Sequence, residues 1–199
     1  MTSEVLVVGA TGTIGSAVVQ TLRDNDIQVI EAARSGTHHT VDLSEPESIK
    51  TFFENVGELG GIVSCAGSAR FVSIPDATDE DWSFSLTNKL MGQINLVRFG
   101  RSHVSEGGSI TLTTGVLADR PMAGSSILTT VNAGLQGFVR STPLDLAGIR
   151  VNAVSPGWVS ETLAAMGENP AEGTPAADVA QLYLAAVQRT PGGDILSTS

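Results

Sequence analysis

The stretch Val5-Leu6-Val7-Val8-Gly9-Ala10-Thr11-Gly12-Thr13-Ile14-Gly15 decides the fold of this chain of 199 residues. A short apolar run leads directly into a glycine-rich turn, and apolar residues then recur at helical spacing from Ile14 to Leu22. Three spaced glycines carry meaning in this context, between a predicted strand and a predicted helix. Gly9 permits a tight turn, Gly12 lets the backbone approach a pyrophosphate, and Gly15 lets the helix pack close to the strand. Because the free N–H groups of a helix start face phosphates, we predict that a dinucleotide contacts a set of turn residues: Gly9, Thr11, Gly12, Thr13, Ile14 and Gly15.

The rest of the chain alternates between short runs rich in Val and Ile and longer amphipathic stretches. The expected strands are Val5–Val8, Ile27–Ala33, a short strand closed by Val41, Gly61–Cys65, Ser109–Thr113, Ile149–Val154 and Asp194–Ser197. The expected helices are Ile14–Arg23, one that starts at Ser44-Glu45-Pro46-Glu47, Asp79–Phe99, Ser125–Leu146 and Asp178–Val187. Such alternation is typical of βαβ units. We therefore predict an α/β fold, a Rossmann-type doubly wound parallel sheet of about seven strands with helices on both faces, formed by residues 1–199 as a single domain.

Two local patterns predict finer structure. Ser44 is expected to cap the second helix, with Glu47 three residues later completing a capping box. The stretch Gly167–Pro175 is rich in glycine and proline, and we interpret it as a flexible loop in a lid region, Ser160–Pro175. That lid would carry substrate specificity.

The charge pattern limits the partners. The formal net charge is −10 and the only lysines are Lys50 and Lys89, which disfavours binding to nucleic acid. No apolar run approaches the ~20 residues needed to span a bilayer, and no basic segment precedes the first apolar run as in a signal peptide. We expect a cytoplasmic protein with no membrane partner, no bound metal and, at its one cysteine, Cys65, a buried apolar side chain.

The end of the second strand predicts which dinucleotide is bound. An NAD site wants a carboxylate there for the ribose diol, whereas Arg34 and Ser35 stand at this point and Glu31 falls too early. A guanidinium can hold a 2′-phosphate through charge-assisted contacts, with Thr11 as a further donor. We therefore predict NADPH or NADP⁺ as cofactor, with NADH less favoured. Four more residues that follow strands three and four are expected to line the adenosine side: Asp42, Leu43, Ala66 and Gly67.

These residues together resemble the short-chain dehydrogenase/reductase family over nearly the whole chain. The glycine turn, Ala66-Gly67, Asn88 and the stretch Ile149–Gly157 carry the resemblance. It implies that Pro156 and Gly157 flank the nicotinamide and that Val159 contacts its carboxamide. It further implies a homodimer or homotetramer built on the two long helices, and a small-molecule substrate.

The family's catalytic set is Asn, Ser, Tyr and Lys, in which tyrosine exchanges the proton and lysine lowers its pKa and holds the ribose. Only the Asn, at Asn88, is kept in this chain. On alignment the tyrosine falls on Leu128, the lysine on Asn132 and the serine on Gly115. The only tyrosine, Tyr183, stands on the last predicted helix. A smaller group of shorter relatives, which the chain also resembles, carries Asn followed by Gly or Ala in place of the lysine. Three residues remain as candidate catalytic groups: Asn88, Thr114 and Asn132.

Three functions stay open at this point. The first is an NADPH-dependent oxidoreductase with unusual site residues, in which Arg70 or Arg120 contacts the substrate and stabilises an oxyanion. The second is a non-catalytic nucleotide-binding protein that acts as a sensor or regulator. The third is an isomerase or lyase that reuses the pocket, with Arg70, Arg120 and Glu161 gathered around it.

Overall fold

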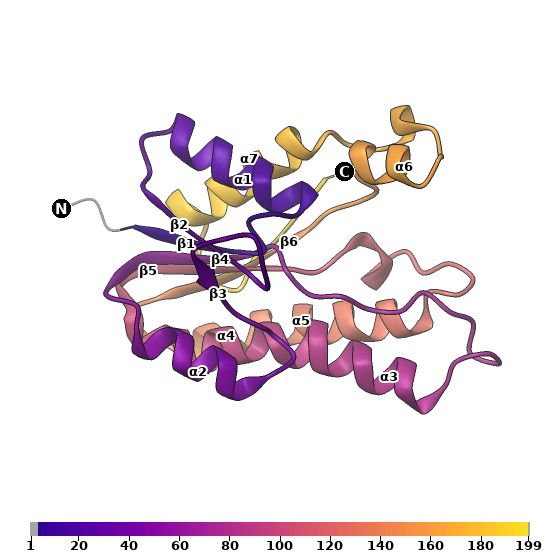
Figure 1. Ribbon diagram of the computed structural model, residues 1–199, viewed down its shortest axis with the longest axis horizontal. Helices are drawn as coiled ribbons and strands as arrows, with labels where there is room; N and C mark the ends of the chain where they lie inside the picture. Colours follow the sequence, from indigo (N-terminus) through magenta and orange to yellow (C-terminus); the bar gives the residue numbers. More distant parts are fainter. Residues whose placement is uncertain (1–3, 199) are drawn as a thin grey trace.

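The computed structural model describes residues 4–198 and shows one seven-stranded sheet. All strands run parallel, in the order β3-β2-β1-β4-β5-β6-β7 (Figure 1). The strands are β1 (Val5–Val8), β2 (Val29–Ala33), β3 (His39–Thr40), β4 (Leu59–Ser64), β5 (Val104–Thr113), β6 (Arg150–Ser155) and β7 (Ile195–Ser197). The carboxyl ends of the strands therefore meet along one edge, which we call the carboxyl edge of the sheet.

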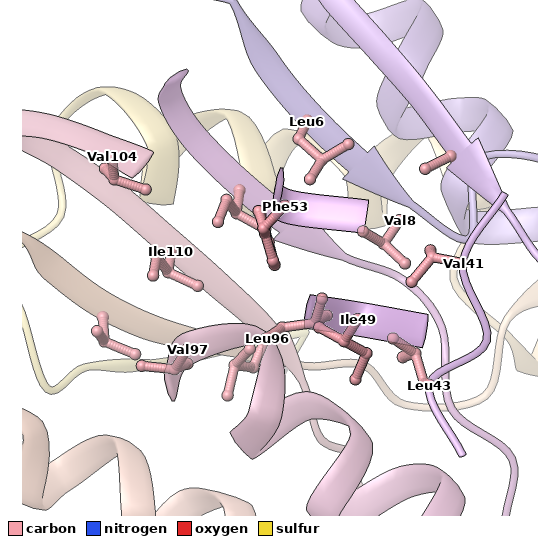
Figure 2. Close-up of a cluster of buried hydrophobic side chains, with 14 of the residues drawn as sticks. Leu6, Val8, Val41, Leu43, Ile49, Phe53, Leu96, Val97, Val104 and Ile110 are labelled. Atoms are coloured by element: carbon pink, nitrogen blue, oxygen red, sulfur yellow. The ribbon is translucent and has the colours of Figure 1, made fainter. Parts of the chain in front are cut away.

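Helices cover both faces of the sheet. Helices α1 (Thr13–Asp24) and α7 (Ala176–Gln188) lie side by side on one face, above the sheet in Figure 1. Helices α2 (Pro46–Glu54), α4 (Gly92–Gly100) and α5 (Ser126–Asp145) lie on the other. Each face has its own buried apolar cluster, and Figure 2 shows the one under α2 and α4, where Leu6, Val8 and Ile110 meet Ile49 and Leu96. The predicted fold class is confirmed.

The fifth strand begins five residues earlier than predicted. The strand β5 runs from Val104 to Thr113 and includes Gly107 and Gly108, which precede the predicted start at Ser109. Gly107 has φ +81°, and the register with β4 shifts between Leu59 and Gly61. The two glycines thus lie at an irregularity of the strand, as glycines inside strands often do.

The long helix predicted over Asp79–Phe99 is divided. Helix α3 (Asp79–Ser85) passes into a π-helical turn, η1 (Leu86–Met91), before α4 begins. A π-helical turn has hydrogen bonds between residues five apart instead of four, so it holds one extra residue, and such turns are frequent at functional sites. This turn holds Asn88 and Lys89.

The predicted cap of the second helix is wrong. Helix α2 begins at Pro46 after Glu45, and no side chain caps it. Ser44 instead donates from its hydroxyl (2.7 Å) and its backbone N–H (2.9 Å) to the Asp42 carboxylate. A charged acceptor forms a stronger hydrogen bond than a neutral one, so the Ser44 side chain turns toward Asp42 rather than toward the helix.

The predicted lid is more ordered than its composition indicates. It contains α6 (Ser160–Ala165) and a 3₁₀ turn, Pro170–Glu172, and a parallel bridge joins Val159 to Thr174. The Glu161 carboxylate accepts hydrogen bonds from the Ala176 N–H at 2.9 and 3.2 Å, and so it caps α7. Glu161 is therefore a structural cap, and no ion pair joins it to Arg70 or Arg120 within residues 4–198, so the cluster that would favour an isomerase or lyase finds no support here. Across the described residues 4–198, no helix is long and apolar enough to cross a bilayer.

Candidate functional site: a cleft at the carboxyl edge

A cleft of about 280 Å³ opens at the carboxyl edge, where β1 lies between β2 and β4. The chain winds from β1 toward β3 on one side of this point and from β4 toward β7 on the other, which makes it the switch point where open α/β sheets bind ligands. Residues from the ends of four strands, together with η1, line it: Val8, Gly9, Thr11, Gly12, Ala33, Arg34, Val41, Asp42, Leu43, Cys65, Ala66, Gly67, Ser68 and Asn88.

The glycine turn has the geometry that its sequence predicts. Gly9 has φ +86°, and an added Cβ there would lie 2.9 Å from the Ala66 nitrogen. At Gly15, the third residue of α1, an added Cβ would lie 2.0 Å from the Gly9 carbonyl oxygen. Gly12 stands at the N-cap of α1, and no side chain caps that helix end. The first N–H groups of α1, around Thr13 and Ile14, are therefore left for an anion.

The side of the cleft formed after β2 and β3 carries one cation, Arg34, and one anion, Asp42. Arg34 is exposed at the end of β2, followed by exposed Ser35, and it makes no ion pair within the described part of the chain. Two hydrogen bonds from Ser44 hold the pKa of the Asp42 carboxyl below its usual value, and the charge of Arg34 contributes further. Glu31 is bonded to Arg23 at 2.6 Å. No carboxylate thus stands at the end of β2, where a ribose diol would need one.

Thr114, the first residue after β5, stands outside the set of residues that line the cleft. The Thr114 side chain is buried, and its hydroxyl points to the Val154 carbonyl oxygen at 3.5 Å. An added Cβ at Gly115 would lie 2.9 Å from the Asn132 Nδ2 atom. Asn132 is 2% exposed, and its Oδ1 atom has no hydrogen-bond partner. An unpaired buried amide oxygen indicates a polar group yet to be bound.

The sequence did not predict a role for Lys89, which follows the cleft residue Asn88 and reaches the segment after β5. Its ammonium donates to the Thr114 carbonyl oxygen at 3.2 Å, across 25 positions of sequence. Its neighbour Asn88 lines the cleft and donates from Nδ2 to the Phe84 carbonyl oxygen at 3.0 Å. The one available signal was that the chain has two lysines and that one directly follows Asn88.

The remaining predicted residues lie at the margins. Pro156 accepts from the Val116 N–H at 2.9 Å, and the Gly157 N–H donates to the Thr198 hydroxyl at 2.9 Å. The Arg70 guanidinium stacks 4.2 Å from the Phe84 ring centre and lies 3.6 Å from Asp81. Arg120 is exposed in the segment after β5. Neither arginine lines the cleft.

A glycine-lined cleft at the switch point of a parallel sheet defines a Rossmann-type nucleotide-binding protein. A family model described as enoyl-(acyl carrier protein) reductase matches residues 9–189, and the chain belongs to the short-chain dehydrogenase/reductase family of oxidoreductases.

Three comparisons describe its relatives. Carbonyl reductase family member 4 of Danio rerio is 29% identical over 182 residues, which cover 80% of this chain and 77% of the relative. The crystal structure of the protein lin1944 from Listeria innocua has a TM-score of 0.93 at 33% identity and covers 99% of this chain and 100% of its own. A small-chain dehydrogenase in complex with NADPH has a TM-score of 0.87 at 25% identity and covers 100% of this chain and 97% of its own. Two other curated relatives are matched over about half of their own length, 43% and 56%.

The only tyrosine of the chain is buried and does not line the cleft, so it is not placed to exchange a proton with a ligand there. Tyr183 is fully buried in α7, and its hydroxyl shares a 2.6 Å hydrogen bond with the Thr113 hydroxyl, which donates to the Ser64 carbonyl oxygen. Burial raises the pKa of Tyr183 well above its ordinary value. The tyrosine is therefore a structural member of the α7–sheet contact.

We expect Tyr183→Phe to lower the free energy of unfolding by about 1–2 kcal/mol, because the buried Thr113 hydroxyl loses a partner. Urea denaturation of both proteins measures this loss. Because Tyr183 does not line the cleft, the oxidoreductase activity of the folded variant should stay within about twofold of wild type, a difference well under 1 kcal/mol. A large loss of turnover with unchanged stability would contradict the structural role.

Proposed function

We propose that this chain is an NADP(H)-dependent oxidoreductase that transfers hydride between the cofactor and a small carbonyl or alcohol substrate. The observation that carries the proposal is the cleft, which joins the glycine turn and Arg34 to Asn88 in η1. The next residue, Lys89, contacts Thr114 beyond β5. NADPH is also what one related structure holds.

The adenosine end fits NADP(H) better than NAD(H). The uncapped start of α1 presents N–H groups to the pyrophosphate, and the added-Cβ distances at Gly9 and Gly15 show how closely the backbone folds there. The exposed Arg34 guanidinium, without a competing carboxylate at the end of β2, would pair with a 2′-phosphate.

The nicotinamide end holds the groups that would orient the reacting ring. The Val159 N–H faces away from the bridge to Thr174, because the hydrogen bonds of that bridge involve Trp158 and Ser160 instead. We infer that this free N–H would donate to the carboxamide of the cofactor. Asn132 would use its unpaired Oδ1 to accept from a ribose hydroxyl. When bound, the cofactor supplies the hydride, which the protein itself cannot provide.

We infer an apolar substrate from four exposed side chains in the segments that follow β4, β5 and β6. Phe71 follows β4, Met122 follows β5, and Trp158 and Met166 follow β6. They are 49%, 51%, 40% and 61% exposed, respectively. An added Cβ at Gly124 would lie 2.9 Å from the Phe71 ring, so the segments after β4 and β5 touch. Exposed apolar side chains beyond the carboxyl ends of these strands would cover the carbon skeleton of a substrate.

Binding and turnover test this function separately. Trp158 stands beside the Pro156-Gly157 turn, so its fluorescence should change when NADPH or NADP⁺ is added. NADPH should bind at least about tenfold more tightly than NADH, a difference of about 1.4 kcal/mol. NADPH absorbance should then fall in the presence of aldehydes, ketones or quinones. Absence of binding by any dinucleotide would overturn the proposal as a whole.

The missing tyrosine favours one alternative, a dinucleotide-binding sensor without turnover. General acid–base help is worth about 10²–10⁴ in rate, and two hydroxyls that follow β5 are engaged: Thr129 donates to the Leu117 carbonyl oxygen at 2.9 Å and Ser125 to that of Met122 at 2.7 Å. A sensor would bind NADPH and NADP⁺ with different affinities and would reduce no carbonyl in the same panel. An oxidoreductase requires another proton donor.

A further inference from the structure

We propose that Lys89 is the proton donor of this site and takes the place of the tyrosine that the chain lacks. The inference rests on the proposed function, because a proton donor is needed where hydride is delivered to a carbonyl. The Lys89 side chain lies at the carboxyl edge between the ends of β4 and β5, beside the cleft.

Two neighbours fix the position of the lysine. Its ammonium donates to the Thr114 carbonyl oxygen at 3.2 Å, directly beyond β5. Its stem passes Gly67, beyond β4, where an added Cβ would lie 3.2 Å from the Lys89 Cα and 3.3 Å from its Cγ. Gly67 lines the cleft and has φ +123°. A side chain at position 67 would crowd the lysine stem, so this glycine leaves room for Lys89 as well as for a ligand.

The π-helical turn η1 sets the lysine at this place. Gln93, fully buried one turn later, donates from Nε2 to the Thr113 carbonyl oxygen at 2.8 Å and accepts from the Thr113 N–H at 2.7 Å. These two hydrogen bonds fasten the start of α4 to the end of β5. Asn88 and Lys89 are consequently held against the edge of the sheet, Asn88 in the cleft lining and Lys89 against Thr114.

Asn132 approaches the same point from α5. Its amide lies against Gly115, the residue after Thr114, and its Oδ1 is unpaired. Asn132 stands where the family resemblance puts the lysine, so the one amino group at this end of the cleft comes from η1 instead of α5. An ammonium donor and an amide with an unpaired oxygen thus meet at Thr114 and Gly115.

The ammonium is suited to giving up a proton near neutral pH. Burial lowers the pKa of Lys89 to about 8, and the residue keeps part of its surface exposed. Among residues 4–198, no carboxylate lies within ion-pair distance of it. Arg70 and Asp81, from the adjoining segments, are directed to each other at 3.6 Å, and burial raises the pKa of Cys65 to about 12, which keeps that thiol neutral. An acid whose pKa lies near the working pH is the most effective.

The step balances in protons and electrons. An N–H bond of the Lys89 ammonium breaks and an O–H bond forms on the substrate oxygen, while the carbonyl carbon accepts a two-electron hydride from the reduced nicotinamide. The amine that remains recovers a proton from water. One carbonyl, one NADPH and one proton are consumed, and one alcohol and one NADP⁺ are formed.

Lys89→Met tests the role, because methionine resembles the stem of lysine without its charge. Replacing a buried ammonium with an apolar group is neutral or stabilising, so the variant should fold and bind NADPH as wild type does. Its turnover with the best carbonyl of the aldehyde, ketone and quinone panel should fall about 10²–10⁴-fold. Lys50→Met, at the exposed lysine of α2, is the matched control and should keep full activity.

The pH profile gives an independent readout. A lowered pKa of about 8 means that the acid is present below pH 8 and is lost above it, so kcat/KM for reduction should fall tenfold per pH unit above about 8. Lys89→Arg, which stays protonated, should lose this fall. In addition, wild type labelled with ¹³C-lysine has two side-chain signals, of which Lys89→Met removes one. The signal of Lys89 should titrate near pH 8 and shift on addition of NADP⁺.

The outcomes separate this inference from the proposed function. An active wild type whose Lys89→Met variant stays within threefold of it overturns the lysine's role and leaves the oxidoreductase intact. A Lys89 signal that shows no titration near pH 8 and no change on addition of NADP⁺ also overturns it. A wild type that binds NADPH but reduces no carbonyl in the panel overturns the proposed function, and the role of Lys89 falls with it.

Discussion

Gly15→Ala should destabilise the protein by about 3 kcal/mol and abolish NADPH binding. An alanine Cβ at position 15 would lie 2.0 Å from the Gly9 carbonyl oxygen and 3.1 Å from the Ala10 Cα. Both neighbours are backbone atoms of the turn that joins β1 to α1, so no side-chain rotation relieves the contact. Helix α1 would have to move away from β1, and Val18, Val19 and Leu22 would leave the apolar cluster that they share with α7.

Urea unfolding and tryptophan-monitored NADPH titration measure both effects. Gly57→Ala is the matched control, because a Cβ at that exposed loop position meets no atom within 4 Å. We expect it to change stability by less than about 0.5 kcal/mol and to leave binding unaltered. A Gly15→Ala variant with wild-type stability and affinity would show that the glycine turn is not under the steric constraint described above.

Arg34→Ala should weaken NADPH binding by about 10–100-fold and leave NADH binding nearly unchanged. A charge-assisted hydrogen bond is worth about 1.5–3 kcal/mol, and Arg34 has no ion-pair partner among residues 4–198 that its removal would strand. The selectivity for NADPH should therefore vanish while the fold persists. The loss should also be smaller at high salt, because Arg34 is exposed and its charge is screened.

Fluorescence titrations of wild type and variant with both cofactors, at two salt concentrations, measure this selectivity. Arg101→Ala is a suitable control, since Arg101 is exposed before β5 at the opposite edge of the sheet. Equal losses for NADPH and NADH in Arg34→Ala would place the guanidinium on a part of the cofactor that both share, such as the pyrophosphate. No loss for either would remove Arg34 from the site.

The geometry of the glycine turn and the place of Arg34 could be predicted from single segments of sequence. Gly9 and Gly15 are required by local backbone geometry, and Arg34 follows directly from where the second strand ends. That Ser44 does not cap α2 could not be predicted, because it depends on whether the Asp42 carboxylate competes for the Ser44 hydroxyl. Side-chain competition of this kind is decided by distances that sequence spacing does not give.

The sequence by itself determined the parallel α/β architecture and the position of the nucleotide turn, since hydrophobic period and glycine geometry are properties of neighbouring residues. Tertiary structure alone decided that the helix after Thr78 carries a π-helical turn and that Lys89 reaches Thr114, 25 residues away. It also decided that Tyr183 is buried against Thr113, 70 residues away. Contacts at such separations form when helices pack on a sheet, and packing is set by the shapes of both partners rather than by the pattern of either one.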